Sequence, residues 1–416
     1  MKELKRLSTL KGKLMLFLAV AGPGIITGNV DNDAGGIATY SAAGARFGFR
    51  MLWLLLIITF SLAVIQEMCA RMGTVTGKGL GDLIRETFGI RLTVITMVAL
   101  LVANMANTAG EFAGIAAGFE IFGISRYIAV PLSALGVWWL VVRGSYRVVE
   151  RFYMMFCVLF ATYVISGVLA RPDWRLVLVS TFKPDFSWDP EFVVMAITLI
   201  GTTIAPWMQF YQQSAIRDKG LTARDLPLER LDTYIGSFLT NFVAFFIVTA
   251  CATVLFPAGI RVETADQAAA ALRPLAGDYC GLLFAAGLVN ASLMAASILP
   301  LTTAYAIAES LGFEGSLEVK SGESKAFYWL YTLMVAVGAA TVMVPRVDFV
   351  GVMLFSQTIN GILLPLILYV MLKIVNDREI MGAHVNTRLE NAIAGAQAVV
   401  LVVLTAVMVW QTIIPR

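Results

Sequence analysis

The sequence predicts an all-α polytopic membrane protein of about eleven transmembrane helices. Of its 416 residues, 58% are hydrophobic and only 14% are charged, whereas soluble domains carry about 25% charged residues. Apolar runs of about 20 residues, long enough to cross the hydrocarbon core of a bilayer, recur along the whole chain. Two of these runs are interrupted in the middle by residues that break helices. A soluble fold could not bury so much apolar surface.

The expected spans follow one another without an inserted hydrophilic domain. The chain, 1–416, is therefore expected to form one transmembrane domain. Within it we assign 14–170 to a first five-helix repeat, 191–374 to a second, and 390–413 to an additional eleventh helix. The eleven spans are predicted at 14–45, 51–71, 92–122, 127–143, 152–170, 191–217, 231–256, 278–311, 326–345, 349–374 and 390–413.

The basic start of the chain is not interpreted as part of a signal peptide. Five Lys or Arg residues lie among the first 13, but the apolar stretch after them continues into a Gly/Pro/Asp segment without a cleavage-like site. Placing the N-terminus in the cytoplasm and alternating sides puts 21 of the 31 Lys and Arg in cytoplasmic segments and 10 outside. This bias predicts a multi-pass protein of the inner (plasma) membrane, with the N-terminus cytoplasmic and the C-terminus outside.

The interruptions lie in the first and sixth spans. The first runs from Gly22-Pro23-Gly24 through Asp31-Asn32-Asp33 to Gly36, and the second covers Thr202 to Pro206. Unwound backbone cannot face lipid and survives only inside protein or beside a cavity. Broken helices five spans apart are typical of an inverted five-plus-five repeat of the leucine-transporter type, with the substrate held between the two breaks.

Three carboxylates lie at membrane depth. Asp31 and Asp33 belong to the first break and Glu111 to the third span. An ionisable side chain there costs at least ~2.5 kcal/mol unless a cation, a partner or water compensates it. Asp33 could instead cap the second half-helix, Asp31 could face a vestibule or cap the break, and Glu111 could pair with a distant arginine. Glu67, at the end of the second span, is expected to be structural.

The other polar groups near the breaks also offer oxygen. Gln357 lies in the tenth span, one turn before Asn360, and could be either a ligand or a helix-to-helix contact. The only histidine, His384, lies in a loop, and the four cysteines have no paired spacing. Carboxylate, amide and carbonyl oxygens suit Mg²⁺, Ca²⁺ and Mn²⁺ better than soft transition metals.

These residues resemble the Nramp divalent-metal transporters along nearly the whole chain. Asp33-Ala34-Gly35-Gly36 looks like the family's Asp-Pro-Gly-Asn motif, and Ala205-Pro206 looks like part of its Met-Pro-His segment. Further similarity is found at Gly44-Ala45-Arg46-Phe47-Gly48, Ser356-Gln357, Leu364-Pro365 and Ile380-Met381-Gly382. The resemblance implies a metal site formed by Asp33, the backbone carbonyl of Thr202 and Gln357, with Glu111 at longer range and with Gly36 and Asp31 beside the ion. The backbone carbonyl of Ala205 could be a further donor.

The departures from the family pattern point to one branch of it. Gly36 occupies the position of the asparagine in the family's motif. Ala205 occupies that of the family's metal-binding methionine, and Trp207 that of the histidine after the proline. A family Asp and Glu of the third span fall near Asn107 and Gly110. Loss of the thioether removes a soft ligand, and the smaller residues leave space for a partly hydrated ion. This combination is similar to the Nramp-related magnesium transporters, which implies Mg²⁺ and Mn²⁺ uptake by alternating access without proton coupling.

Three alternatives remain open from the sequence. They are a proton-coupled Mn²⁺/Fe²⁺ symporter of the same family, an amino-acid or Na⁺ symporter of the same fold, and an intramembrane enzyme, for which no catalytic motif is found. We expect no cofactor apart from the transported ion, no nucleic-acid partner and no obligate protein partner. The expected partners are the divalent cation and the lipid bilayer.

Overall fold

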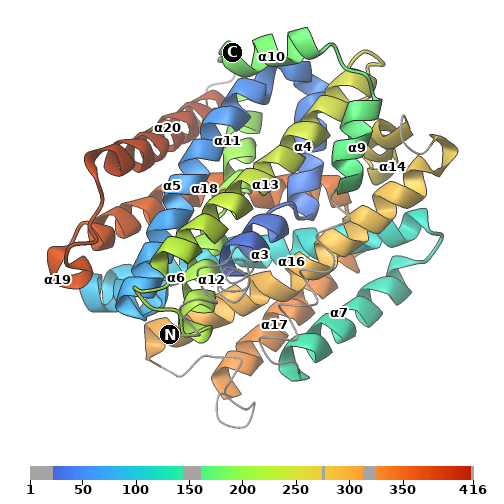
Figure 1. The fold of residues 1–416 in the computed structure, drawn as a ribbon. Helices are drawn as coiled ribbons and strands as arrows, with labels where there is room; N and C mark the ends of the chain where they lie inside the picture. Colours follow the sequence, from blue (N-terminus) through green and yellow to red (C-terminus); the bar gives the residue numbers. More distant parts are fainter. Residues whose placement is uncertain (1–21, 144–160, 274–276, 313–324, 414–416) are drawn as a thin grey trace, which may run out of the picture.

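The computed structural model describes residues 22–143, 161–273, 277–312 and 325–413, and within these ranges the chain is helical and forms no strand (Figure 1). Eight stretches in them are long and apolar enough to cross a membrane. The main helices are α3 (Pro23–Val30), α4 (Ala34–Phe47), α5 (Leu52–Thr76), α6 (Leu80–Ile121), α7 (Arg126–Arg143), α9 (Ala161–Leu169), α10 (Trp174–Phe182), α11 (Pro190–Thr203), α12 (Pro206–Asp218), α13 (Leu226–Val254), α16 (Cys280–Leu311), α17 (Lys325–Val342), α18 (Phe349–Val375) and α20 (Arg388–Ile413).

The predicted fold class is confirmed. Every one of the eleven expected spans overlaps a helix, and both expected interruptions are present. The predicted residues 14–21 and 152–160 lie outside the described residues. Three short elements, α14 (Ala265–Ala269), η3 (Ala270–Leu272) and η4 (Gly277–Tyr279), occupy the connection before α16, and α19 (Arg378–Met381) precedes α20.

The first interruption is shorter than the sequence suggested. Only Asp31, Asn32 and Asp33 separate α3 from α4. Pro23 stands in the first turn of α3, where its missing N–H costs nothing and its fixed φ suits a helix. The Gly22-Pro23-Gly24 segment therefore forms the start of α3.

The second interruption arises from Pro206. α11 ends at Thr203, and α12 begins at Pro206 after the two residues Ile204 and Ala205. The carbonyl of Thr202 would normally accept a bond from the N–H four residues later, but that residue is Pro206, which has none. A backbone oxygen is thus released in the middle of the bundle.

Two groups of helices surround the breaks (Figure 1). α13 packs along α3, α4 and α5, while α6 packs along α16, α17 and α18. α3 and α13 are in backbone contact, because a Cβ on Gly28 would lie 2.7 Å from the carbonyl carbon of Gly236. The first half-helix and α13 are therefore expected to move as one piece.

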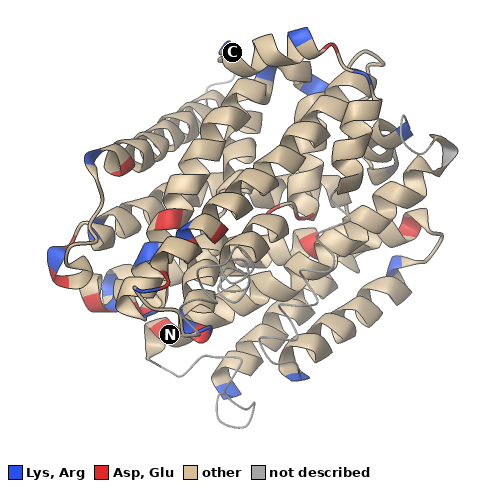
Figure 2. Cartoon of the chain, in the orientation of Figure 1, with Lys and Arg blue, Asp and Glu red and all other residues tan. Residues whose placement is uncertain are grey.

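α6 begins earlier than predicted, at Leu80 instead of residue 92. Gly89, at φ 69°, bends the chain between a short initial segment and the long span, and a left-handed φ of this kind favours glycine. Figure 2 shows many charged residues at the margins of the bundle and a smaller number inside it. Among those at the margin, Arg50 donates two hydrogen bonds to Asp185 and lowers the pKa of that carboxyl.

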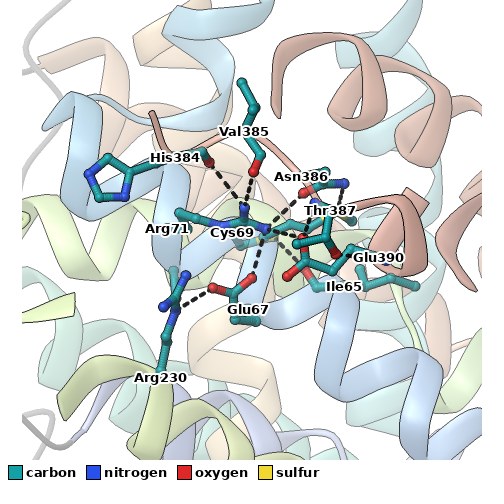
Figure 3. Close-up of polar contacts among 12 residues, drawn as sticks. Ile65, Glu67, Cys69, Arg71, Arg230, His384, Val385, Asn386, Thr387 and Glu390 are labelled. Atoms are coloured by element: carbon teal, nitrogen blue, oxygen red, sulfur yellow. Dashed lines mark hydrogen bonds and ion pairs between the residues drawn. The ribbon is translucent and has the colours of Figure 1, made fainter. Parts of the chain in front are cut away.

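An ion-pair cluster around the buried Glu67 and Arg71 joins α5 to α13 and α20 (Figure 3). Glu67 lies 2.9 Å from Arg71 and 2.6 Å from Arg230. Arg71 also donates to the carbonyls of His384 and Val385 in the loop before α20. The expected structural role of Glu67 is confirmed, since both of its oxygens are used in holding these elements together.

Candidate metal site at the two helix breaks

Asp33 is the N-terminal cap of α4. Its Oδ1 accepts a hydrogen bond of 2.5 Å from the backbone N–H of Gly36, and its backbone is extended, as a capping residue requires. The capping role considered from the sequence is thus confirmed. It fixes the carboxylate at the positive end of a half-helix, where a negative charge is stabilised at membrane depth.

Glu111 reaches the same helix end from α6. Its Oε2 accepts a hydrogen bond of 3.1 Å from the N–H of Ala34, while its Oε1 is buried without a hydrogen-bond partner. Among the described residues, no Lys or Arg forms an ion pair with Glu111, so the expected alternative of a distant arginine is not found there. Asp33 and Glu111 therefore both accept hydrogen bonds from backbone N–H groups in the first turn of α4.

Gly36 marks a space on which oxygens from both breaks converge. A Cβ placed on Gly36 would lie 2.8 Å from the carbonyl oxygen of Asp31, 3.2 Å from Asp33 Oδ1 and 3.5 Å from Thr202 Oγ1. Any side chain at position 36 would crowd these atoms. Glycine contributes no side-chain ligand here but leaves the space between three oxygens open.

The hydroxyl of Thr202 was not anticipated from the sequence, which pointed only to its carbonyl. Thr202 Oγ1 is buried and has no hydrogen-bond partner. A buried hydroxyl without a partner costs about 1–3 kcal/mol, which a bound cation or its water would offset. Thr203, the next residue, differs in that its hydroxyl is bound to Leu199 O and Tyr40.

Asp31 lies in the same break and carries an uncompensated carboxylate. The residue is only 1% exposed, and neither carboxylate oxygen has a hydrogen-bond partner. Its neighbour Asn32 instead anchors the break to Thr240 of α13. Burying an isolated carboxylate costs much free energy. A cation near the break would therefore stabilise Asp31 as well as Asp33.

Ala205 contributes space instead of a free carbonyl. Its carbonyl accepts a bond of 3.1 Å from the N–H of Met208, which directs that oxygen into α12. The methyl side chain is 1% exposed. Of the two carbonyls suggested by the sequence, that of Thr202 is released by Pro206 and that of Ala205 is engaged.

The side-chain amide of Gln357 lies directly against Gly35 in the first turn of α4. The approach is so close that a Cβ on residue 35 would overlap the amide. Its Oε1 accepts a hydrogen bond of 2.8 Å from Asn360, and Asn360 exchanges two further bonds with Asn107 of α6. An amide oxygen has two lone pairs, so Gln357 can retain Asn360 and still approach an ion. The sequence alone did not reveal that Asn107 and Asn360 position this side chain.

All the candidate residues that have side chains are buried, none more than 3% exposed. No group of three or more His, Cys, Asp or Glu is arranged as a metal cluster in the part of the chain that the structure describes. The site therefore combines carboxylates with carbonyl, hydroxyl and amide oxygens. This donor set is hard and loosely arranged, as suits a hydrated divalent ion that must also leave.

Comparison with known proteins gives a consistent result. The profile of the family described as Nramp, natural resistance-associated macrophage protein-like, matches residues 24–411. A divalent metal cation transporter MntH of Deinococcus radiodurans is 26% identical over 411 residues, covering 95% of this chain and 90% of the relative.

Solved structures show the same fold. A manganese transporter of Eremococcus coleocola aligns with a TM-score of 0.78 at 20% identity, covering 95% of this chain and 87% of the other. MhsT in complex with L-phenylalanine aligns with a TM-score of 0.60 at 14% identity, covering 92% and 98% of the two chains. At these identities the likeness establishes the helical architecture alone.

Proposed function

Because the chain belongs to the Nramp family, we propose that it transports divalent cations, Mg²⁺ and Mn²⁺, across the plasma membrane by alternating access and without proton coupling. The N-terminus lies in the cytoplasm and the C-terminus outside. The observation that carries the proposal is the convergence of Asp31 O, Asp33 Oδ1 and Thr202 Oγ1 beside Gly36. Relatives named as divalent metal cation transporters support the substrate class.

The choice of ion rests on what surrounds these oxygens. Ala205 places a methyl group where the family has a thioether, and Gly36 adds no side chain. Neither of these two residues offers a sulfur ligand to a soft metal, and the extra space suits an ion that keeps some of its water. Mg²⁺ is dehydrated reluctantly and usually retains several waters.

The absence of proton coupling rests on the polar side chains one and two turns before Glu111 on α6. Asn104 donates to Thr303 Oγ1 at 2.9 Å, and Asn107 is paired with Asn360. These amide and hydroxyl groups do not titrate, and Trp207 occupies the position of the family's histidine. A proton leaving Glu111 by this route meets no base. The membrane potential suffices as driving force, since a divalent ion gains roughly 4.6 kcal/mol per 100 mV.

The alternative is a proton-coupled Mn²⁺/Fe²⁺ symporter, favoured by the three carboxylates Asp31, Asp33 and Glu111 at the break. Both functions require Asp33. Mn²⁺ influx into proteoliposomes is expected to vanish in Asp33→Ala and to persist in Asp185→Ala, which removes a carboxylate outside the spans. Normal influx in a folded Asp33→Ala protein would refute the site.

A further inference from the structure

Two acidic side chains are buried near the start of α13, away from the helix breaks. Glu229 and Asp232 are both 0% exposed and stand three residues apart, so they share one face of the helix. Neither belongs to the candidate site described above. Two buried negative charges in one turn require compensation.

The negative charge of Asp232 is partly compensated by hydrogen bonds from the backbone. Its Oδ2 accepts bonds of 2.7 Å from Gly24 N–H and 3.2 Å from Gly22 N–H, at the start of α3. It thus caps a neighbouring helix and faces the positive end of that helix. Its Oδ1 is buried without a hydrogen-bond partner.

The charge of Glu229 is not accounted for by any hydrogen bond. Both of its carboxylate oxygens are buried without a hydrogen-bond partner. The groups within electrostatic reach are Asp232 and Asp225, which repel it, Lys219, which attracts it, and the amide of Gln212. Glu229 therefore keeps two buried acceptor oxygens, and Asp232 and Gln212 are among the polar groups that act on it.

Gln212 supplies an independent oxygen from α12. Its amide nitrogen donates 2.7 Å to Thr233 Oγ1, which orients the amide, and its Oε1 is buried without a hydrogen-bond partner. The side chain is 0% exposed. A carboxyl pair and an amide, from two helices, thus leave acceptor oxygens that no donor satisfies.

We propose that Glu229, Asp232 and Gln212 bind a second hard divalent cation, of the Mg²⁺ or Mn²⁺ class. Carboxylate and amide oxygens are the ligands that such ions prefer. Gln212 lies six residues after Pro206 along α12, roughly 9 Å at the rise of an α-helix. The second site therefore uses the same half-helix, α12, that begins at the second break. The second site would exist whether or not the ion at the break has been assigned correctly.

The test counts Mn²⁺ ions bound to the purified full-length protein by electron paramagnetic resonance. Asp33→Ala removes the site at the break, so any remaining bound Mn²⁺ reports the second site. We expect Asp33→Ala to bind one Mn²⁺ per chain and Asp33→Ala/Glu229→Gln to bind it at least tenfold more weakly. The matched control is Asp33→Ala/Asp225→Asn, which removes a nearby carboxylate that is engaged with Thr222, and it should bind like Asp33→Ala.

Equal Mn²⁺ binding in Asp33→Ala with and without Glu229→Gln, or none in Asp33→Ala, would overturn the second site. If Mn²⁺ binding persists in each single variant, Asp33→Ala and Glu229→Gln, but is lost in the double variant, both sites are supported. If Glu229→Gln does not fold, Gln212→Glu in the Asp33→Ala background adds a carboxylate and should tighten binding. Unchanged or weaker binding there would also overturn the proposal, while the site at the break would still be tested by Asp33→Ala alone.

Discussion

Glu111 of α6 accepts a hydrogen bond from the N–H of Ala34 in α4, although the two residues belong to different helices. The third span thereby holds the first turn of the half-helix that carries Asp33. The bond uses one carboxylate oxygen and leaves the other without a partner. Glu111 thus has both a structural and an electrostatic part in the candidate site.

Two substitutions of Glu111 separate these parts. Glu111→Gln keeps an oxygen for Ala34 N–H but removes the charge, so we expect a protein that folds normally and binds Mn²⁺ about tenfold more weakly, which is about 1.4 kcal/mol. Glu111→Ala also leaves the N–H unsatisfied and should lower the free energy of unfolding by about 1–3 kcal/mol. Thermal unfolding and Mn²⁺ titration measure the two effects, and equal unfolding temperatures for the variants would contradict this division.

Thr202→Val tests the hydroxyl that sequence reasoning missed. Valine has nearly the same shape, and Thr202 Oγ1 has no protein hydrogen bond to lose, so folding should be preserved. The Michaelis constant for Mn²⁺ uptake should rise several-fold if the hydroxyl faces the ion. Thr249→Val is the matched control, because Thr249 is also buried with an unpartnered hydroxyl but lies outside the site. A shift of the same size in both variants would argue against a role for Thr202.

Ala205→Met tests the source of metal selectivity. A thioether at this position would give the site a soft ligand and fill part of its space. We expect Cd²⁺ uptake to increase relative to Mg²⁺ uptake, measured in the same proteoliposomes. An unchanged ratio in a folded variant would place selectivity elsewhere.

Glu309→Gln tests what holds α12 against α16 and α6. Glu309 of α16 accepts bonds from Ser214 at 2.6 Å and Arg217 at 2.8 Å on α12, and from Gly81 N–H at 3.3 Å in α6. Loss of its charge should loosen α12, the second half of the broken sixth span. Labelling of Ala215→Cys by a hydrophilic maleimide should then accelerate, because Ala215 is only 1% exposed when α12 is held in place.

The control for that experiment is Glu86→Gln. Glu86 pairs with Lys78 at 2.6 Å on the exposed surface, where ion pairs contribute little. Its removal should leave the labelling rate of Ala215→Cys unchanged. Equal rates in the Glu309→Gln and wild-type backgrounds would mean that this cluster does not restrain α12.

The sequence predicted the helical architecture well because span length and helix breakers are local properties. Pro206 and the Asp31-Asn32-Asp33 segment locate both breaks, since a proline and buried charges cannot be accommodated in a regular lipid-facing helix. Pro23, which was expected to belong to the first break, stands in the first turn of α3, where a proline is tolerated.

The contacts of the site could not be predicted in the same way. The Glu111–Ala34 bond joins residues 77 positions apart, and the Asn107–Asn360 bonds join residues 253 apart. Such pairs depend on how helices pack, which a single sequence does not specify. The free hydroxyl of Thr202 and the buried acceptors near Glu229 are likewise properties of the packed structure.

The most direct test of the proposed function follows Mg²⁺ uptake into proteoliposomes under a negative membrane potential, with a pH-sensitive dye in the same vesicles. The account predicts Mg²⁺ entry without acidification, and loss of that entry in Asp33→Ala. No Mg²⁺ entry, together with Mn²⁺ entry that acidifies the vesicle interior, would contradict it and would assign a proton-carrying role to the carboxylates at the break.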